Sequence, residues 1–166
     1  MFELLADGAA LNRTNDRDIT ELTRRATAAT YHCDGLKPEG TEFIERVVQM
    51  SAQSVGAAAR NSHQRLVTAM SGEILAGFVI ATRHDENSRE LDWLMVDPQF
   101  HGGSIASPLM SAATSWLGKD RPIWLNVVRH NERAIRFYRK HGFEIDPEAN
   151  CAHAMPHSIM RRRPDR

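Results

Sequence analysis

The stretch from residue 89 to 118 reads RELDWLMV, DPQFHGGSI and ASPLMSAATSWLG, which predicts a strand, a turn and a helix in succession. The first eight residues favour a strand, because they carry apolar and aromatic side chains and end before a proline. Gly102 and Gly103 then allow the backbone a tight turn. Pro108 fits the first turn of the following helix, because proline lacks the N–H group that would have no partner there. We therefore expect the helix to begin near Ile105.

The start of this helix has the properties of an anion site. Its first N–H groups have no intrahelical acceptor, and the positive end of the helix dipole lies beside them. We expect the amides of Gly103 to Ser107 to face a phosphate such as a pyrophosphate. Two glycines before a helix also fit a tight connection that binds nothing. The sequence has neither the G-x-G-x-x-G pattern of dinucleotide sites nor a P-loop.

The rest of the chain predicts a single mixed sheet. In order, we expect an extended piece at 8–13, a helix to about 31 behind N-cap candidates at 14–18, a helix from about 41, strands at 65–70, 73–83 and 89–96, a helix to about 118, a strand at 123–128, a helix at 131–141, and a last strand at 152–162 bulged at Pro156. The order β-α-α-β-β-β-α-β-α-β predicts an α/β fold with one mostly antiparallel central sheet flanked by helices. No linker divides residues 1–166, so we expect one domain.

A second segment, 123–143, reads IWLNVVRHNERAIRFYRKHGF. Asn131 stands where a helix N-cap belongs, and Tyr138 follows two turns later on the same face, with the small Ala134 between them. Against one acid, Glu132, the segment carries five basic residues: Arg129, Arg133, Arg136, Arg139 and Lys140. This local positive charge suits a polyanionic ligand, although a solvated helix face would look the same. Tyr138 also fits a core aromatic residue whose hydroxyl bonds to backbone.

Together the two segments resemble the GNAT superfamily of acyl-CoA-dependent N-acyltransferases. The first matches its cofactor-binding segment with Val96-Asp97-Pro98 and then His101-Gly102-Gly103-Ser104-Ile105-Ala106. The second matches its other motif with Asn131, Ala134, Phe137, Tyr138, Gly142 and Phe143. The element order also agrees, and for the first 60 or so residues it is all that agrees.

Two positions depart from the family pattern. His101 stands where the family usually has Gln or Arg, and Ser104 where it usually has Gly. Ser104 can cap the helix and still present its amide if its φ is negative. We interpret both changes as relaxed stringency at a cofactor site that is kept.

The resemblance implies acetyl-CoA as co-substrate and no metal. The residues that it implies for cofactor binding are Leu94, Met95, Val96, His101, Gly102, Gly103, Ser104, Ile105, Ala106, Asn131, Arg133 and Tyr138. In this family an amine attacks the thioester directly, so backbone at 94–96 is expected to pair with the pantetheine arm. Asn131 would hydrogen-bond that arm, and Tyr138 would protonate the departing thiolate.

The attacking amine needs a base, because an amine with a pKa near ~10 is protonated at pH 7. Strand alternation predicts that Glu90, Asp92, Leu94 and Val96 share one face. Glu90 lies six residues before Val96, where some family members carry a catalytic Glu, so it is the preferred base and Asp92 the second choice. Either acid also fits a surface or strand-end position.

Composition limits the alternatives. The chain has 21 basic and 21 acidic residues, so it lacks the net positive charge that is typical of proteins that bind nucleic acid. Arg161–Arg163 alone is a short basic tail, which is weak evidence for such binding. Two cysteines are too few for a disulfide framework, no apolar run reaches the ~20 residues of a membrane span, and the N-terminus lacks signal-peptide features, so we expect a cytoplasmic protein.

Two other readings stay open. One is a catalytically inert acyl-CoA-binding module of the same fold. The other is a metal site built from Cys151, His153 and His157, with His141 as a further ligand.

The acceptor is less defined. Nine acids against six bases in residues 1–50 suit a cationic small-molecule amine, while a protein or peptide amine is the alternative. Neither nucleic acid nor membrane is expected as a partner, and a homodimer is possible.

Overall fold

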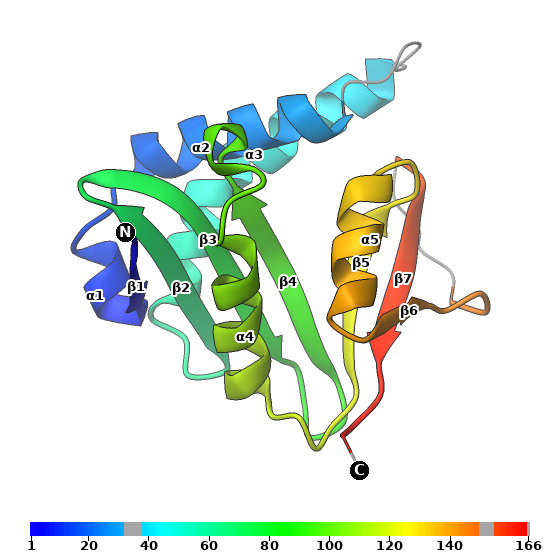
Figure 1. The fold of residues 1–166 in the computed structure, drawn as a ribbon. Coiled ribbons are helices and arrows are strands. Elements are labelled where there is room, and N and C mark those ends of the chain that lie inside the picture. Colours follow the sequence, from blue (N-terminus) through cyan, green and yellow to red (C-terminus); the bar gives the residue numbers. More distant parts are fainter. Residues whose placement is uncertain (32–37, 150–154, 166) are drawn as a thin grey trace.

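The computed structural model describes residues 1–31, 38–149 and 155–165. Its centre is a seven-stranded sheet with the order β1-β2-β3-β4-β5-β7-β6, which confirms the predicted mixed α/β fold (Figure 1). The strands are β1 (Glu3–Ala6), β2 (Gln64–Ser71), β3 (Ile74–Arg83), β4 (Arg89–Val96), β5 (Ile123–Val128), β6 (Phe143–Ile145) and β7 (His157–Arg162). The helices are α1 (Asp7–Leu11), α2 (Asp16–Tyr31), α3 (Pro38–Ala58), α4 (Ala106–Leu117) and α5 (Glu132–Lys140), with a 3₁₀ turn η1 (Pro98–Phe100).

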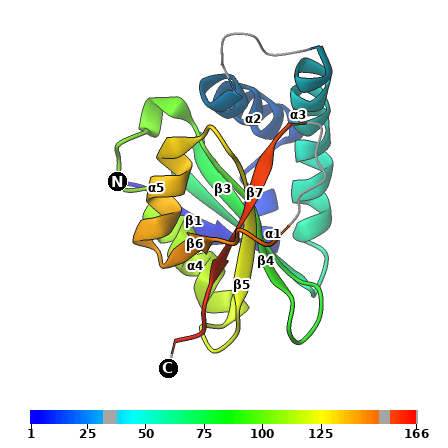
Figure 2. The same cartoon turned by 90° about the vertical axis from the view of Figure 1, so that its right-hand side faces the viewer.

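Helices cover both faces of the sheet. Helices α2 and α3 lie on one face, and α4 and α5 lie on the other, as the edge-on view shows (Figure 2). The core is divided accordingly into two clusters. Leu22 of α2 packs with Phe78 on one side, and Leu109 of α4 packs with Val79 on the other, because neighbouring strand residues point to opposite faces.

Several element boundaries follow the local signals. Strands β4 and β5 have the predicted limits, and α4 begins at Ala106, next to the predicted start. Asn15 caps α2 by accepting the Asp18 amide at 2.9 Å. Gly142 ends α5 with φ 82°, a left-handed conformation that glycine adopts without strain.

The predicted extended piece at 8–13 is wrong. The strand lies earlier, as β1, and residues 7–11 form the short helix α1. Asp7 makes the turn between them with φ 48°. Its carboxylate accepts the Leu66 amide at 3.0 Å and pairs with Arg65 at 3.0 Å, so tertiary contacts with β2 hold this conformation.

The predicted C-terminal strand is only partly right. Strand β7 begins at His157, directly after Pro156, and residues 152–154 of the prediction lie outside the described chain. The prediction missed β6, which pairs with β7 at the sheet edge. A strand of three residues directly after a helix is too short to show a period of two in the sequence.

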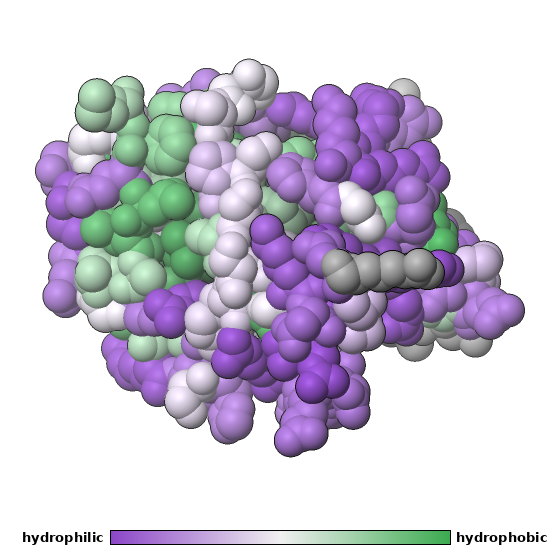
Figure 3. Space-filling view, turned by 60° about the horizontal axis from the view of Figure 1, so that its bottom comes forward, coloured by the Kyte–Doolittle hydropathy of each residue, from purple (hydrophilic) through white to green (hydrophobic). Residues whose placement is uncertain are grey.

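The outer surface carries few large apolar side chains in the described residues. The exposed ones are Met1, Leu4, Met50, Ile74 and Ile145. Apolar side chains gather on one side of the face shown in Figure 3, and hydrophilic ones cover most of the rest. None of the helices in residues 1–31, 38–149 and 155–165 combines the length and apolar composition that a membrane crossing requires.

Candidate active site between the diverging strands

The central feature is the separation of β4 from β5. Of the six neighbouring strand pairs in the described chain, this is the one parallel pair, and it consists of only Arg89 with Ile123 and Glu90 with Trp124. Beyond Glu90 the strands diverge, with α4 and α5 on the two sides of the opening (Figure 1). On the side of β4 that faces β5, the backbone from Leu91 to Val96 therefore has no strand partner in the described chain.

A cavity of about 750 Å³ fills this opening, within the ~300–1,000 Å³ usual for small-molecule sites. It brings together residues 90–96 of β4, the glycine turn and the exposed face of α5. Of the residues that sequence analysis selected, those lining the cavity are Glu90, Asp92, Leu94, Met95, Val96, His101, Gly102, Gly103, Ala106, Asn131, Arg133 and Tyr138. Ser104 and Ile105 instead line a smaller neighbouring depression.

The prediction that Glu90 shares a face with Leu94 and Val96 is wrong. Ile80 and Ala81 of β3 are adjacent, yet they pair with Trp93 and Leu91 of β4. Asp92 is therefore the extra residue of a β-bulge, which reverses the alternation of side chains along the strand. Leu91 packs in the same cluster as Leu94, on the α4 side, and Glu90 consequently points to the other face.

Glu90 is buried and held by its neighbours. Its Oε2 atom lies 2.6 Å from Nε2 of His84, which follows β3, and only 8% of the residue is exposed. The His84 ring stacks on Trp124 with ring centres 5.8 Å apart. The Trp124 indole N–H donates to Ser88 Oγ at 3.2 Å. These contacts place the Glu90 carboxylate at the closed end of the cavity.

Asp92 differs from Glu90 in its surroundings. It is an exposed residue that lines the cavity, and the surrounding protein partly desolvates its carboxyl group. This desolvation, with the negative charge of Glu90, raises the pKa of Asp92 to about 7, against a smaller opposing effect of His84. A carboxyl group with this pKa exchanges protons readily near neutral pH.

The glycine turn lies at the opposite end of the cavity. Gly102 has φ 80°, and a Cβ atom there would contact nothing within 4 Å, so the backbone angle alone requires glycine. The prediction that the Gly103 amide is free is wrong, because this amide donates to Phe100 O at 3.1 Å. The amides of Ala106 and Ser107 occupy the first helical positions, where no intrahelical acceptor exists.

Ser104 does not cap α4. The N-cap residue is Ile105, which has no side-chain oxygen, and no side-chain bond closes this end of the helix. Ser104 does have a negative φ, the condition set for presenting its amide. The uncapped start of the helix leaves room for an outside acceptor.

His101 joins the two sides of the opening. Its Nε2 atom lies 3.1 Å from Val96 O, and a carbonyl can only accept, so Nε2 carries the proton. The other ring nitrogen, Nδ1, then accepts from Arg133 Nη1 of α5 at 2.6 Å. Desolvation, followed by the positive charge of Arg133, lowers the pKa of His101, which keeps the ring neutral.

Helix α5 presents its inner face to the cavity. Asn131 is its N-cap, and its Oδ1 atom accepts the Ala134 amide at 3.1 Å. Tyr138 lies on the same face, is 9% exposed and contacts the rings of Phe137 and Phe143. Its ring is thus fixed by the core while the residue still lines the cavity.

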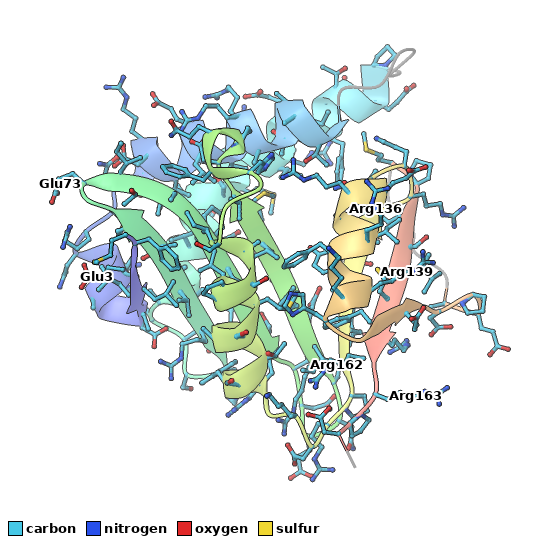
Figure 4. All side chains as sticks on the ribbon, in the orientation of Figure 1. Glu3, Glu73, Arg136, Arg139, Arg162 and Arg163 are labelled. Atoms are coloured by element: carbon cyan, nitrogen blue, oxygen red, sulfur yellow. The ribbon has the colours of Figure 1, made fainter. Side chains whose placement is uncertain are left out.

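The five basic residues of 129–140 divide between cavity and surface. Arg133, Arg136 and Lys140 line the cavity. Arg129 donates to His157 O at 3.0 Å, and Arg139 lies 3.9 Å from Glu144 outside the lining. Figure 4 shows Arg136 and Arg139 at different positions along α5. Only part of the predicted positive charge therefore faces the cavity.

Sequence analysis missed the residues that helices α2 and α3 contribute. The lining includes Ala26, Thr27 and Thr30 of α2 and Val47 of α3. In the sequence, small and β-branched residues on an amphipathic helix cannot be distinguished from ordinary core residues. Phe100 also reaches the cavity, and no motif marks it in the sequence.

The predicted metal ligands do not form a site in the described residues. Cys151 and His153 lie outside them. His157 lines the cavity with Nδ1 at 2.6 Å from Met155 O, whereas His141 Nε2 lies 3.3 Å from Ser107 Oγ. Within residues 1–31, 38–149 and 155–165, no three His, Cys, Asp or Glu side chains are placed to hold a metal ion.

Known structures share this fold across almost the entire chain. PaiA N-acetyltransferase from Thermoplasma acidophilum, solved with coenzyme A, is 21% identical with a TM-score of 0.75, over 98% of this chain and 99% of that one. A GNAT-family acetyltransferase from Staphylococcus aureus Mu50 is 14% identical with a TM-score of 0.71, over 98% of each chain. At these identities the likeness shows the fold.

Sequence comparison gives the family. An uncharacterized N-acetyltransferase of Mycobacterium tuberculosis H37Rv is 36% identical over 85 residues, 49% of this chain and 53% of that protein, so the chain spans about half the length of this curated relative. Residues 21–143 match the acetyltransferase (GNAT) family. That match covers most of the chain and includes both motifs of the cavity, and the protein therefore belongs to the GNAT family of acetyltransferases.

Proposed function

We propose that the protein transfers an acetyl group from acetyl-CoA to the primary amine of a small cationic molecule. The observation that carries this proposal is the divergence of β4 from β5 over a cavity that holds two carboxyl groups and a tyrosine. An extended pantetheine arm can lie along Leu94 to Val96 as an added strand, because the backbone of that edge has no strand partner.

The turn before α4 fits the diphosphate of the nucleotide. The amides of Ala106 and Ser107 point out of the helix start, and Arg133 and Lys140 add positive charge to the cavity wall. Asn131 lies beside the opening and would bond the pantetheine arm through the part of its amide that does not cap α5.

The proton of the attacking amine goes to the carboxylate end. Asp92 is the group that accepts it, since its pKa of about 7 lies near neutral pH and its side chain opens into the cavity. Glu90 was the preferred base from the sequence. Its bond to His84 instead supports a role in keeping the Asp92 pKa high.

Acyl transfer then proceeds by direct attack. The neutral amine nitrogen bonds to the thioester carbon, the C–S bond breaks, and an amide on the edge 94–96 stabilises the carbonyl oxygen. Tyr138 lines the cavity and would give its phenolic proton to the departing thiolate. The products are the N-acetyl amine and coenzyme A.

Release of free thiol from acetyl-CoA tests this function. The wild-type protein is incubated with acetyl-CoA and a panel of mono- and polyamines, amino acids and lysine-containing peptides, and products are identified by mass. Amine-dependent thiol release with an acetylated small amine supports the proposal. Peptide-only acetylation would identify a protein or peptide acetyltransferase. Coenzyme A binding without turnover on the whole panel would identify an inert binding module.

A further inference from the structure

One hydrogen-bonded chain crosses the mouth of the cavity. It runs from Val96 O at the end of β4, through both ring nitrogens of His101, to the guanidinium of Arg133 on α5, with distances of 3.1 and 2.6 Å. The two strands bordering the opening make no pairing beyond Glu90. The His101 ring thus links the β4 side of the cavity to the α5 side.

The protonation state of His101 determines what this chain can do. With the proton on Nε2, a neutral ring offers Nδ1 as an acceptor to Arg133, whereas an imidazolium would place two positive groups side by side. Burial and the charge of Arg133 itself keep the pKa of His101 low. The bond therefore fixes one guanidinium nitrogen, and the remaining donors of Arg133 are directed by it.

The position of Arg133 indicates what those donors bind. It lines the cavity together with Gly102 and Gly103, and the uncapped start of α4 lies beside the same turn. By contrast, Arg136 on the next turn of α5 pairs with Glu132 at 3.3 Å. No acidic partner of Arg133 occurs within 4 Å in the described residues, so its charge is not neutralised by a carboxylate.

We propose that His101 is a positioning residue that holds the Arg133 guanidinium against the diphosphate of the nucleotide bound at the glycine turn. This inference rests on the proposed function for the identity of the ligand. It adds a specific arrangement, in which a neutral histidine acts through an arginine 32 residues away in the chain. A guanidinium fixed in this way contacts a phosphate group with less loss of side-chain freedom than a free arginine would.

Binding of three ligands to five variants tests the arrangement. The variants are R133Q, H101A, H101Q, the double variant H101A/R133Q, and R139Q as the matched control from the outer part of α5. The ligands are coenzyme A, 3′-dephospho-coenzyme A and pantetheine, with dissociation constants from calorimetric titration or competition. Melting temperatures of all variants are measured alongside, so that a folding defect is recognised.

The expected pattern is selective. R133Q and H101A each weaken coenzyme A binding about 10-fold, as expected for loss of a hydrogen bond to a charged group, and the double variant is within about twofold of R133Q. H101Q restores most of the affinity, since its amide NH2 group can donate to Val96 O and its amide oxygen can accept from Arg133 in place of the ring nitrogens. The losses persist with 3′-dephospho-coenzyme A and disappear with pantetheine, while R139Q resembles the wild type.

Other outcomes overturn the proposal in distinguishable ways. Additive losses in the double variant would mean that His101 acts independently of Arg133. Losses confined to coenzyme A and absent with the 3′-dephospho form would move the contact to the 3′-phosphate. Equal losses with pantetheine would mean a general disturbance of the cavity. A wild-type protein that binds none of the ligands would instead contradict the proposed function itself.

Discussion

The two ends of the cavity are lined by different chemical groups. At the turn end, backbone amides at the start of α4 and the side chains of His101 and Arg133 surround an open mouth. At the closed end, the buried Glu90, which belongs to the last paired position of β4 and β5, and the nearby Asp92 place two carboxyl groups at the cavity wall. Under the proposed function, the turn end would bind the anionic nucleotide and the closed end would carry out the proton chemistry. Substitutions at the two ends should therefore affect different quantities.

Removing the proton acceptor is expected to have the largest effect. D92N should lower kcat/KM for the amine by about 100-fold or more at pH 7.5, because an amide cannot accept the amine's proton. The dissociation constant for coenzyme A should stay within about twofold of the wild type. Steady-state thiol release and calorimetric titration measure the two quantities.

The surface acid Glu86, in the loop between β3 and β4, provides the matched control. E86Q should retain full activity, because its exposed side chain is not part of the cavity lining. If D92N turned over at the wild-type rate, another group would have to accept the proton. The assignment of the proton chemistry to Asp92 at the closed end would then be wrong.

Tyr138 tests the middle of the cavity. Y138F should lower kcat by about 10- to 100-fold, since the leaving thiolate loses its proton donor, while coenzyme A binding stays nearly constant. Y138F keeps the ring contacts with Phe137 and Phe143, and its melting temperature, measured alongside, separates a folding defect from loss of the proton donor. Unchanged kcat, with the chemical step shown to be rate-limiting, would remove this role from Tyr138.

Gly102 tests the turn end. G102A forces a side chain into φ 80°, which costs about 1–2 kcal/mol and distorts the anion site. We expect a lower Tm and roughly fivefold weaker coenzyme A binding, with a nearly normal kcat at saturation. Gly8 is the control, because a Cβ there meets nothing within 4 Å and its φ is not positive. A loss of kcat without weaker binding in G102A would contradict the division between the ends.

The pH profile should show the smallest effect, and it tests directly whether the charge of Glu90 raises the pKa of Asp92. For the wild type, kcat/KM should rise with pH and level off above about 7, as Asp92 loses its proton and becomes a base. In E90Q the negative charge that raises the Asp92 pKa is gone, so the inflection should move to lower pH. An inflection that stays in place, or moves upward, would mean that another group controls the profile.

The parts of the site that were predicted correctly from the sequence are determined by residues close to one another in the chain. The limits of β4 and β5, the start of α4 and the Asn131 cap all depend on residues within one or two turns of each other. Glycine conformation, proline at a helix start and side-chain capping act over that range. The position of the glycine turn and of the helix that follows it was therefore predictable, but the Gly103 amide and the Ser104 side chain behave differently from the prediction.

The parts that it missed depend on distant contacts. The face of Glu90 is set by a bulge opposite β3, and no residue type in β4 marks that bulge. The bond between His101 and Arg133 joins residues 32 positions apart, and the wall from α2 and α3 reads as ordinary helix core. The face of Glu90 at the closed end and the bond between His101 and Arg133 at the turn end thus both required the structure.

A structure of the protein with coenzyme A, determined by crystallography, tests the central claim most directly. The account predicts the pantetheine arm extended along residues 94–96 between β4 and β5, and the diphosphate within hydrogen-bond distance of the Ala106 and Ser107 amides. A coenzyme A molecule bound elsewhere, with this turn empty, would contradict it.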